Sequence, residues 1–333
     1  MTRTRSLVLT ATLSALAFGG CSAVADTRGV SDDVTVTNCE KEVSFPSPAR
    51  RLFVNDSNLI SMVLALGAED QVVAVSSMNR DQNVLTEHYG SAVGDLNQVS
   101  DDYPSLETVI AQRPDVMVAG YGYGYDDAKH LTPDSLAIHG IGAYVLTESC
   151  RQDDSAARGI VDPWTALRDD LTNLGQITGH TEQAMKVIAE LDARIQALRG
   201  LPQPKKKPVL FVFDSGDNAI FTSGALGAPQ AIIETTGGRN AVEDLRDTWT
   251  EVSWERLAAA QPDAFLFVDY PGQSFEQKVA ILQAHPATRN LPAVKQERFL
   301  DLPYVMWTSG PLNIVAAEDV RAALEKWRLV PTR

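Results

Sequence analysis

Tyrosines interleaved with glycines form the segment of the sequence best suited to binding chemistry. The loop GYGYGYDD at 120–127 presents Tyr121, Tyr123 and Tyr125. Its glycines alternate as GxGxG, whereas a dinucleotide-binding turn needs GxGxxG between a strand and a helix. Tyrosines on flexible glycines offer aromatic faces and hydroxyl groups to a planar or chelated ligand. The alternative is a surface loop in which one tyrosine packs against the protein.

Motifs for catalysis or metal binding are not found. The sequence contains no nucleophile elbow, no HExxH and no Walker loop. Its histidines are scattered and lack the spacing of a zinc or manganese site. They are His88, His130, His139, His180 and His285. We therefore predict no catalytic residue, no metal site and no cofactor. A chelatase-like or cofactor-dependent enzyme on a similar fold is the less favoured alternative.

Composition and charge are typical of a globular protein that does not bind nucleic acid. Of 333 residues, 44% are apolar and 22% are charged, and the net charge is -14. Nucleic-acid binding needs clustered lysine and arginine. The one basic run, at 205–207, lies between prolines and has the composition of a solvated linker. A chain of this length is expected to form two domains.

Residues 1–20 are predicted to be a secretory signal peptide. Two arginines precede an apolar run that is too short to span a membrane stably. Two glycines directly before Cys21 resemble a bacterial lipobox, which implies a lipid on Cys21, although Phe18 departs from the usual aliphatic residue. A plain signal peptide is the alternative. Residues 21–38 are small and polar, and they are predicted to be a flexible tether.

The two remaining cysteines are Cys39 and Cys150. In an oxidising exterior they would most simply pair, closing a loop of about 110 residues and stabilising the first domain. Two buried free thiols are the alternative.

Strands alternate with helices in both halves of the sequence, which predicts parallel sheets covered on both faces. We expect an N-terminal lobe at 39–160, a bridging helical segment at 161–203 and a C-terminal lobe at 204–333. The run TEQAMKVIAELDARIQAL within the bridging segment places apolar side chains at helical spacing. The predicted fold class is α/β, with two Rossmann-like lobes, each a mainly parallel sheet with flanking helices, joined by a long rigid helix.

One phrase occurs once in each half. LETVIAQRPDVMVAG at 106–120 and WERLAAAQPDAFLFVD at 254–269 each place a glutamate, Glu107 or Glu255, in the first turn of an amphipathic helix. Both helices end at Pro-Asp before an apolar strand. The helix dipole alone favours an acidic residue at such a position, so the glutamates have a structural explanation as well as any functional one.

Six segments in this order resemble the substrate-binding lipoproteins of bacterial ABC importers, of the class that carries ferric siderophores, haem or cobalamin. They are NCEKEVSFPSPARRLFV, LALGAEDQVVAVSS, LETVIAQRPDVMVAG, LGQITGHTEQA, IFTSG followed by IIETTGGRNAVED, and VSWERLAAAQPDAFLFV. The resemblance covers about residues 40 to 328 of the sequence. It implies the class III arrangement of periplasmic binding proteins, in which one helix bridges two lobes and the ligand lies in the cleft between them.

The resemblance also implies a function. The protein would be the extracytoplasmic solute-binding component of an ABC importer, anchored by lipid to the outer face of the cytoplasmic membrane. As a monomer it would deliver an iron–siderophore complex to a permease driven by an ATPase. Glu107 and Glu255 match glutamates that meet permease arginines in this family. Haem, cobalamin or another chelate-like cofactor is the alternative ligand.

Ligand-binding residues are expected in the loops that follow parallel strands, because open sheets bind ligands at the carboxyl ends of their strands. These loops include 214–218 and 304–310. The resemblance adds Phe221 and Trp249, where cobalamin-binding members place aromatic residues, whereas Met78 stands where such members have an aromatic residue. The predicted ligand-binding residues are Asn55, Ser57, Met78, Tyr121, Tyr123, Tyr125, Phe221, Arg246, Trp249, Tyr270 and Trp307.

Overall fold

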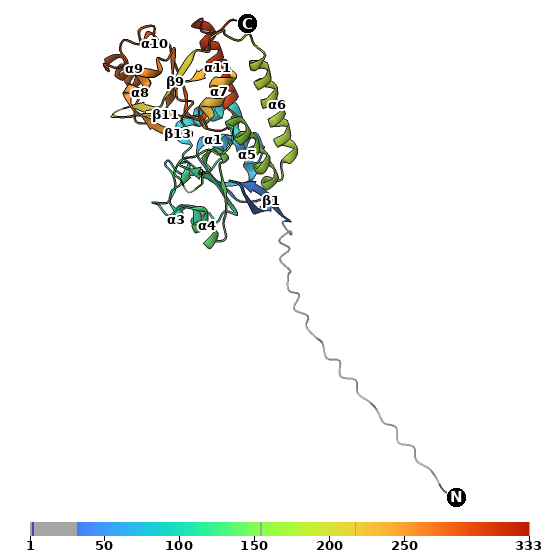
Figure 1. Cartoon of the computed structure of the whole chain (residues 1–333). Helices are drawn as coiled ribbons and strands as arrows, with labels where there is room; N and C mark the ends of the chain where they lie inside the picture. Colours follow the sequence, from blue (N-terminus) through green and yellow to red (C-terminus); the bar gives the residue numbers. More distant parts are fainter. Residues whose placement is uncertain (1, 3–31, 154, 217, 333) are drawn as a thin grey trace. The chain divides into compact units, whose positions relative to one another are not determined.

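Figure 1 shows the computed structural model of the chain, which describes residues 2, 32–153, 155–216 and 218–332. The predicted signal peptide and the predicted lipidation site, Cys21, lie outside the described residues, apart from Thr2 in the signal peptide. Residues 31–333 form one compact unit. The boundaries predicted for the two lobes within this unit stay predictions.

The first half builds a parallel sheet in the order β5-β4-β3-β6-β7, with β8 also paired to β6. The strands β3 and β6 are almost wholly buried, as expected where helices cover both faces. The strands are β3 (Leu52–Asn55), β4 (Val72–Ser76), β5 (Gln98–Ser100), β6 (Val116–Tyr121), β7 (Gly124–Tyr125) and β8 (Gly142–Val145). The helices are α1 (Ser57–Ala65), η1 (Glu69–Gln71), η2 (Asn79–Asp81), α2 (Gln82–Tyr89), η3 (Gly90–Val93), α3 (Leu106–Ala111), α4 (Pro133–Ile138) and η4 (Thr147–Ser149).

The second half builds a parallel sheet in the order β12-β9-β14-β15 and an antiparallel sheet in the order β10-β11-β13. The strands are β9 (Val209–Phe213), β10 (Ser215–Gly216), β11 (Ile220–Ser223), β12 (Arg239–Asn240), β13 (Trp249–Val252), β14 (Ala264–Asp269) and β15 (Phe299–Pro303). The helices are α7 (Ala228–Thr235), α8 (Trp254–Ala260), α9 (Phe275–Ala284), α10 (Pro292–Lys295), η5 (Tyr304–Met306) and α11 (Asn313–Lys326). The predicted α/β class is therefore confirmed.

Two long helices connect the halves. α5 (Pro163–Thr178) starts at its N-cap Asp162 and ends at Gly179, which has the left-handed conformation that suits a helix terminus. α6 (Thr181–Arg199) follows, packing against α5 on one side and against α7 and α11 of the second half on the other (Figure 1). At 1.5 Å per residue its length is about 28 Å. The long bridging helix expected from the sequence is present.

The chain enters the first half through a hairpin that the sequence analysis did not predict. β1 (Asp32–Asn38) pairs antiparallel with β2 (Lys41–Ser47) across a two-residue turn, in which Cys39 and Glu40 both have positive φ. Residues 32–38 belong to the predicted tether, so that part of the prediction is wrong. Alternating valine and threonine carried the strand signal, but the polar composition of the segment obscured it.

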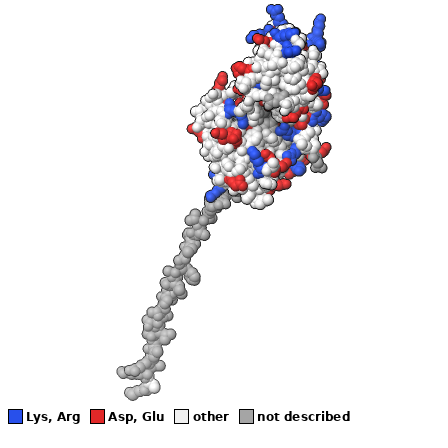
Figure 2. Space-filling view, turned by 90° about the vertical axis from the view of Figure 1, so that its left-hand side faces the viewer, with Lys and Arg blue, Asp and Glu red and all other residues white. Residues whose placement is uncertain are grey.

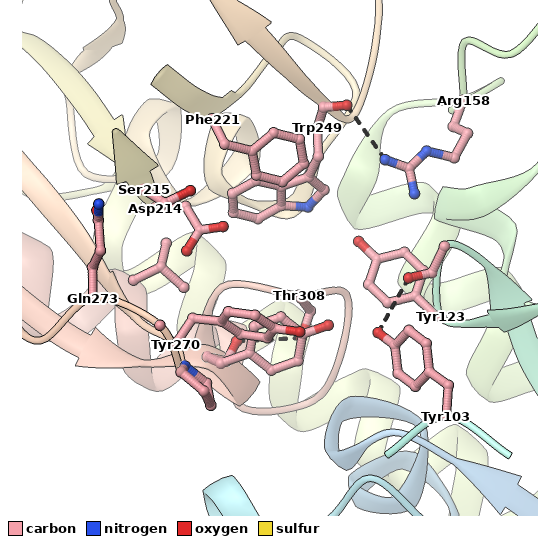
Figure 3. A pocket seen from close by; sticks show the side chains of 15 residues that line it. Tyr103, Tyr123, Arg158, Asp214, Ser215, Phe221, Trp249, Tyr270, Gln273 and Thr308 are labelled. Carbon is pink, nitrogen blue, oxygen red and sulfur yellow. Dashed lines mark hydrogen bonds between the residues drawn. The ribbon is translucent and has the colours of Figure 1, made fainter. Parts of the chain in front are cut away.

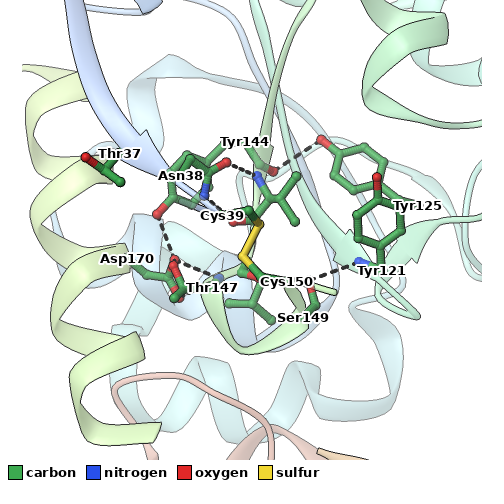
Figure 4. The surroundings of a disulfide bond; sticks show 12 residues. Thr37, Asn38, Cys39, Tyr121, Tyr125, Tyr144, Thr147, Ser149, Cys150 and Asp170 are labelled. Carbon is green, nitrogen blue, oxygen red and sulfur yellow. Dashed lines mark hydrogen bonds between the residues drawn. A yellow bond between two sulfur atoms is a disulfide. The ribbon is translucent and has the colours of Figure 1, made fainter. Parts of the chain in front are cut away.

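Side-chain contacts fix this hairpin to the edge of the first sheet (Figure 4). Asn38 accepts a hydrogen bond from the N–H of Val145 (2.8 Å) and donates to its carbonyl oxygen (2.7 Å). Its amide thereby pairs with β8 as a neighbouring strand would. The next residue, Cys39, forms a disulfide with Cys150, which confirms the predicted pairing.

The repeated phrase folds the same way in both halves. Ser105 caps α3 and Ser253 caps α8. Each serine lies two residues before the glutamate of the phrase, Glu107 or Glu255. The residue before each proline has positive φ, 49° at Arg113 and 47° at Gln261.

The aspartate that follows the proline ties two strands together at their start. The carboxylate of Asp115 accepts the N–H of Arg50 (3.0 Å), just before β3, and that of Asp263 accepts the N–H of Val209 (2.8 Å) in β9. The aspartate of each Pro-Asp pair therefore aligns the start of one parallel strand with its neighbour. The exposed glutamates have no part in this alignment.

Charged side chains of both signs are scattered among uncharged residues on one face of the compact unit. Figure 2 shows lysine and arginine interspersed with aspartate and glutamate on the face that it presents. Among the described residues, no helix combines the length and the apolar character that crossing a membrane requires.

Removal of the disulfide should lower the free energy of unfolding by about 3 kcal/mol, because the crosslink restricts the unfolded chain over a separation of 111 residues. Urea unfolding of the Cys39→Ser/Cys150→Ser variant beside the oxidised protein measures the difference. A reductant should shift the midpoint of the original protein to that of the variant and leave the variant unchanged. An identical midpoint before and after reduction would contradict the expectation.

Candidate functional site

A cavity of about 510 Å³ lies where loops at the carboxyl ends of the two parallel sheets meet (Figure 3). The first half contributes the loop after β6, Tyr103 and Arg158, and the second half contributes the loops after β9, β14 and β15. This is where open α/β sheets bind ligands. The lining residues are Tyr103, Gly122, Tyr123, Arg158, Asp214, Ser215, Phe221, Trp249, Val268, Tyr270, Pro271, Gly272, Gln273, Tyr304 and Thr308.

Aromatic rings form most of the walls. Phe221 of β11 and Trp249 of β13 stack at 5.9 Å between ring centroids, because these strands are neighbours in the antiparallel sheet. Tyr270 and Tyr304 pack against each other at 5.1 Å between ring centroids, and Figure 3 shows Tyr270 across the hollow from the first pair. Two facing aromatic pairs suit a bulky ligand with flat or apolar faces.

A buried carboxylate holds the wall tyrosines in place. Asp56, the N-cap residue of α1, is fully buried and accepts hydrogen bonds from the hydroxyl groups of Tyr103 (2.8 Å) and Tyr304 (3.0 Å). Arg80 also donates to it at 3.0 Å, and the guanidinium lies 5.0 Å from the ring centroid of Tyr270. Burial raises the pKa of Asp56, and Arg80 opposes that rise. One carboxylate thus positions tyrosines from both halves.

A second set of contacts also joins the halves near the cavity. The buried carboxylate of Glu148 accepts from the hydroxyl of Tyr123 (3.0 Å) and from the N–H of Ala228 (2.8 Å), the first residue of α7. Burial raises the pKa of Glu148 to about 7. Arg158 donates to the carbonyl oxygens of Tyr121 (2.9 Å) and Trp249 (3.3 Å), so its guanidinium also links the two halves.

Two polar groups of the lining have no hydrogen-bond partner among the described residues. They are Oδ1 of Asp214 and Nε1 of Trp249. Burial raises the pKa of Asp214 to about 6, and Lys278 opposes that rise. Figure 3 shows both groups directed toward the hollow. An unpaired buried acceptor beside an unpaired buried donor is the kind of pair that a bound ligand satisfies.

Four of the predicted ligand-binding residues line this cavity. They are Tyr123, Phe221, Trp249 and Tyr270. The three tyrosines of the loop at 120–127 lie in different surroundings. Tyr123 lines the cavity, whereas the ring of Tyr121 packs against the guanidinium of Arg151. Tyr125 is buried and donates to the carbonyl oxygens of Met117 and Tyr144. The register of β7 beside β6 separates the three side chains.

The structure places the other predicted residues outside the lining. Asn55 and Ser57 are buried and hydrogen-bonded, Asn55 to Tyr123 and Ser76, and Ser57 to Asp81. Both therefore support the cavity from behind.

Met78 lies in the core, and Trp307 is fully buried with its Nε1 donating to the carbonyl oxygen of Phe267. Arg246 is exposed in a separate surface groove.

Sequence reasoning did not single out several residues of the lining. Asp214, Tyr304 and Thr308 lie within loops that it selected, so their position after a strand was the available signal. Tyr103 follows the three-residue strand β5, which was not predicted. Arg158 lies in a long connection before α5, and nothing in its local sequence marks it.

The paired glutamates of the repeated phrase are exposed, away from the cavity lining. Hydrogen bonds from their own N–H groups and from the capping serines, Ser105 and Ser253, lower the pKa of Glu107 and Glu255. Glu276, two residues after the cap of α9, shows the same lowering from the same cause. The charge of these glutamates therefore follows from helix position, and their electrostatics alone assign no function.

Comparison with known proteins identifies the family. A family model described as Periplasmic binding protein matches residues 55–305, which is more than half of the chain. The chain belongs to this family. The family match agrees with the two parallel sheets, the bridging helix and the cavity between the halves.

Individual relatives are distant. A vitamin B12-binding protein of Salmonella typhi is 26% identical over 212 residues, 63% of this chain and 70% of its own. An ABC-type Fe3+-hydroxamate transport protein of Saccharomonospora viridis superposes with a TM-score of 0.74 at 21% identity, covering 87% of this chain and 98% of its own. A periplasmic heme-binding protein of Vibrio cholerae gives 0.62 at 20%, covering 82% and 98%. At these identities the two structures establish the fold.

Metal ligands do not cluster in the described part of the chain. No group of three or more His, Cys, Asp or Glu side chains there is arranged to hold a metal ion. The described lining of the cavity likewise includes no histidine.

Glu148 should make the protein less stable as the pH rises. Its folded pKa of about 7 exceeds the ordinary value of 4.5, so the protonated carboxyl contributes stability below about pH 4.5, and this contribution is lost as the pH rises through 7. At about 1.4 kcal/mol per pKa unit the loss is about 3 kcal/mol. Denaturant unfolding between pH 5 and 8 should show a shallower pH dependence for Glu148→Gln.

Glu234, exposed on α7, supplies the matched control variant Glu234→Gln. Equal pH dependence in Glu148→Gln and the unmodified protein would contradict the assignment of this titration.

Proposed function

We propose that the protein is the extracytoplasmic solute-binding component of an ABC importer, and that it captures a ferric siderophore and delivers it to a membrane permease. The observation that carries the proposal is the cavity between two parallel sheets, walled by facing aromatic pairs and bearing unpaired polar groups. Its volume is within the range of ligand pockets for compact organic molecules.

Ferric siderophores suit this cavity better than haem. Haem iron is held in proteins by axial side chains such as histidine or tyrosine. The described lining has no histidine, and three of its four tyrosines, Tyr103, Tyr123 and Tyr304, already donate their hydroxyl groups to buried carboxylates, which leaves Tyr270 as the one axial candidate in that lining. A siderophore supplies all the iron ligands itself, so it needs only complementary walls. Cobalamin, named in the Salmonella relative, is the second candidate because Phe221 and Trp249 stack in the lining.

The remaining parts of the proposal concern export, membrane anchoring and oligomeric state. A signal peptide at 1–20 would direct export, and a lipid on Cys21 would hold the protein at the outer face of the cytoplasmic membrane. The lobes at 39–160 and 204–333 would act as a monomer around the segment 161–203. The protein would bind its cargo without chemical conversion.

Docking on the permease would use Glu107 and Glu255. Both are exposed, ionised and placed identically in the repeated phrase of each half. Charge-assisted pairs at two separated points fix orientation and speed encounter.

Tryptophan fluorescence should identify the ligand. Titration of the mature protein with ferric hydroxamate, catecholate and carboxylate siderophores, haem and cobalamin should give saturable quenching by a siderophore. Trp249→Ala should weaken that binding by about tenfold or more, because it removes one face of the aromatic wall. Trp327→Phe, outside the lining, is the matched control. Binding of haem or cobalamin alone would favour the alternative, and turnover of a ligand would favour an enzyme.

The Glu107→Ala/Glu255→Ala variant should abolish uptake in cells and leave ligand affinity nearly unchanged, because both side chains lie outside the cavity lining. Uptake of the radiolabelled ferric complex and titration of the purified variant measure the two effects. Glu276→Ala is a close control, since Glu276 has the same position relative to its helix cap. Loss of ligand affinity in the double variant, or an equal loss of uptake in Glu276→Ala, would contradict the docking assignment.

A further inference from the structure

Asp214 is the most unusual polar residue of the cavity. It directly follows β9, the residue is only 9% exposed, and its Oδ1 has no hydrogen-bond partner among the described residues. A buried acceptor without a partner costs roughly 1–3 kcal/mol, and more when it is charged. Such a group in a binding cavity therefore calls for a partner that arrives with the ligand.

The nearest cation does not fill this role. The ammonium group of Lys278 is buried and donates a hydrogen bond to the carbonyl oxygen of Val268. It interacts electrostatically with three carboxylates, those of Asp214, Asp269 and Asp301. One ammonium shared by three carboxylates leaves this side of the cavity with an excess of negative charge.

On the opposite side of the cavity the lining carries the guanidinium of Arg158, which also interacts with the buried carboxyl of Glu148 behind Tyr123. Figure 3 shows Arg158 and Asp214 on opposite sides of the hollow, with the stacked rings of Phe221 and Trp249 between them. The guanidinium uses two of its N–H groups on the carbonyl oxygens of Tyr121 and Trp249, and it keeps its charge. The cavity thus has a negative end, and the guanidinium of Arg158 lies at the other end.

Several other polar groups of the lining are already paired. The hydroxyl groups of Tyr103 and Tyr123 donate to carboxylates, and the amide of Gln273 exchanges hydrogen bonds with Gly216. Among the described residues of the lining, the buried side-chain atoms without a partner are Oδ1 of Asp214, an acceptor, and Nε1 of Trp249, whose N–H is a donor. A ligand that satisfies both groups must offer a donor to the first and an oxygen acceptor to the second.

We propose, on the basis of the proposed siderophore-binding function, that Asp214 selects ferric siderophores that carry an ammonium group outside their iron-chelating oxygens. The ammonium donates to Oδ1 of Asp214, an oxygen of the ligand accepts from Nε1–H of Trp249, and the electron-rich chelate oxygens face Arg158. A trihydroxamate with a free terminal amine has this charge distribution. A tris-catecholate complex, which is strongly anionic, places negative charge against the negative end.

A pair of ligands that differ only in the ammonium group tests this assignment. Ferrioxamine B carries a terminal ammonium, and its N-acetyl derivative does not. Isothermal titration calorimetry should show that the protein binds the ammonium form about tenfold more tightly, the effect expected of one charge-assisted hydrogen bond that is partly open to water. Asp214→Asn should bring this ratio close to one.

Asp301→Asn is the matched control, because Asp301 shares the cluster around Lys278 and lies outside the cavity lining. This variant should keep the tenfold ratio. Denaturant unfolding of both variants establishes that they are folded.

Equal affinity for the two ligands in the unmodified protein, or a preference that survives in Asp214→Asn, would overturn the role of Asp214. In both cases binding of the acetylated form would leave the proposed function intact. Failure of both ferrioxamines with tight binding of a tris-catecholate would overturn this inference alone. Failure of every ferric siderophore would overturn the inference and the proposed function together.

Discussion

The buried carboxylate of Asp56 is the constraint on which the shape of the cavity depends. It follows β3 directly, caps α1 with a positive φ of 77°, and gathers Arg80, Tyr103 and Tyr304 around its two oxygens. A charge in the interior is stable only when such partners surround it. Because the tyrosines come from different halves, the interaction specifies how the halves face each other. The backbone strain at Asp56 indicates that the surrounding structure enforces this arrangement.

The sequence predicted the elements well and the direction of single side chains poorly. Loops after buried strands were recognisable, and Tyr123, Phe221, Trp249 and Tyr270 do line the cavity. Yet Trp307, which lies in one of the same loops, is buried in the core. Which side chain of a loop faces inward depends on strand register and on contacts with the other half, and local sequence contains neither.

Some residues of the repeated phrase have a structural role in the fold, and others do not. The residue before each proline has the left-handed conformation, and Asp115 and Asp263 each accept a backbone hydrogen bond from the neighbouring strand or the residues before it. The glutamates have no comparable role. The two sets of contacts between the halves, together with the helix α6, which packs against elements of both, favour small movements of the halves over a wide hinge opening. If docking proceeds through Glu107 and Glu255 as proposed, small movements of this kind would leave the surface that carries them largely unchanged.

The hairpin fixed by Asn38 and the Cys39–Cys150 disulfide has a mechanical consequence. The strand β1 is the first element of the compact unit, and a covalent bond joins the tip of its hairpin to the first half. A mechanical force applied to the chain before β1 would therefore act on the first half, through the hairpin and the disulfide, and not directly on the second half. The disulfide would thus confine such a force to one attachment point, outside the residues that line the cavity.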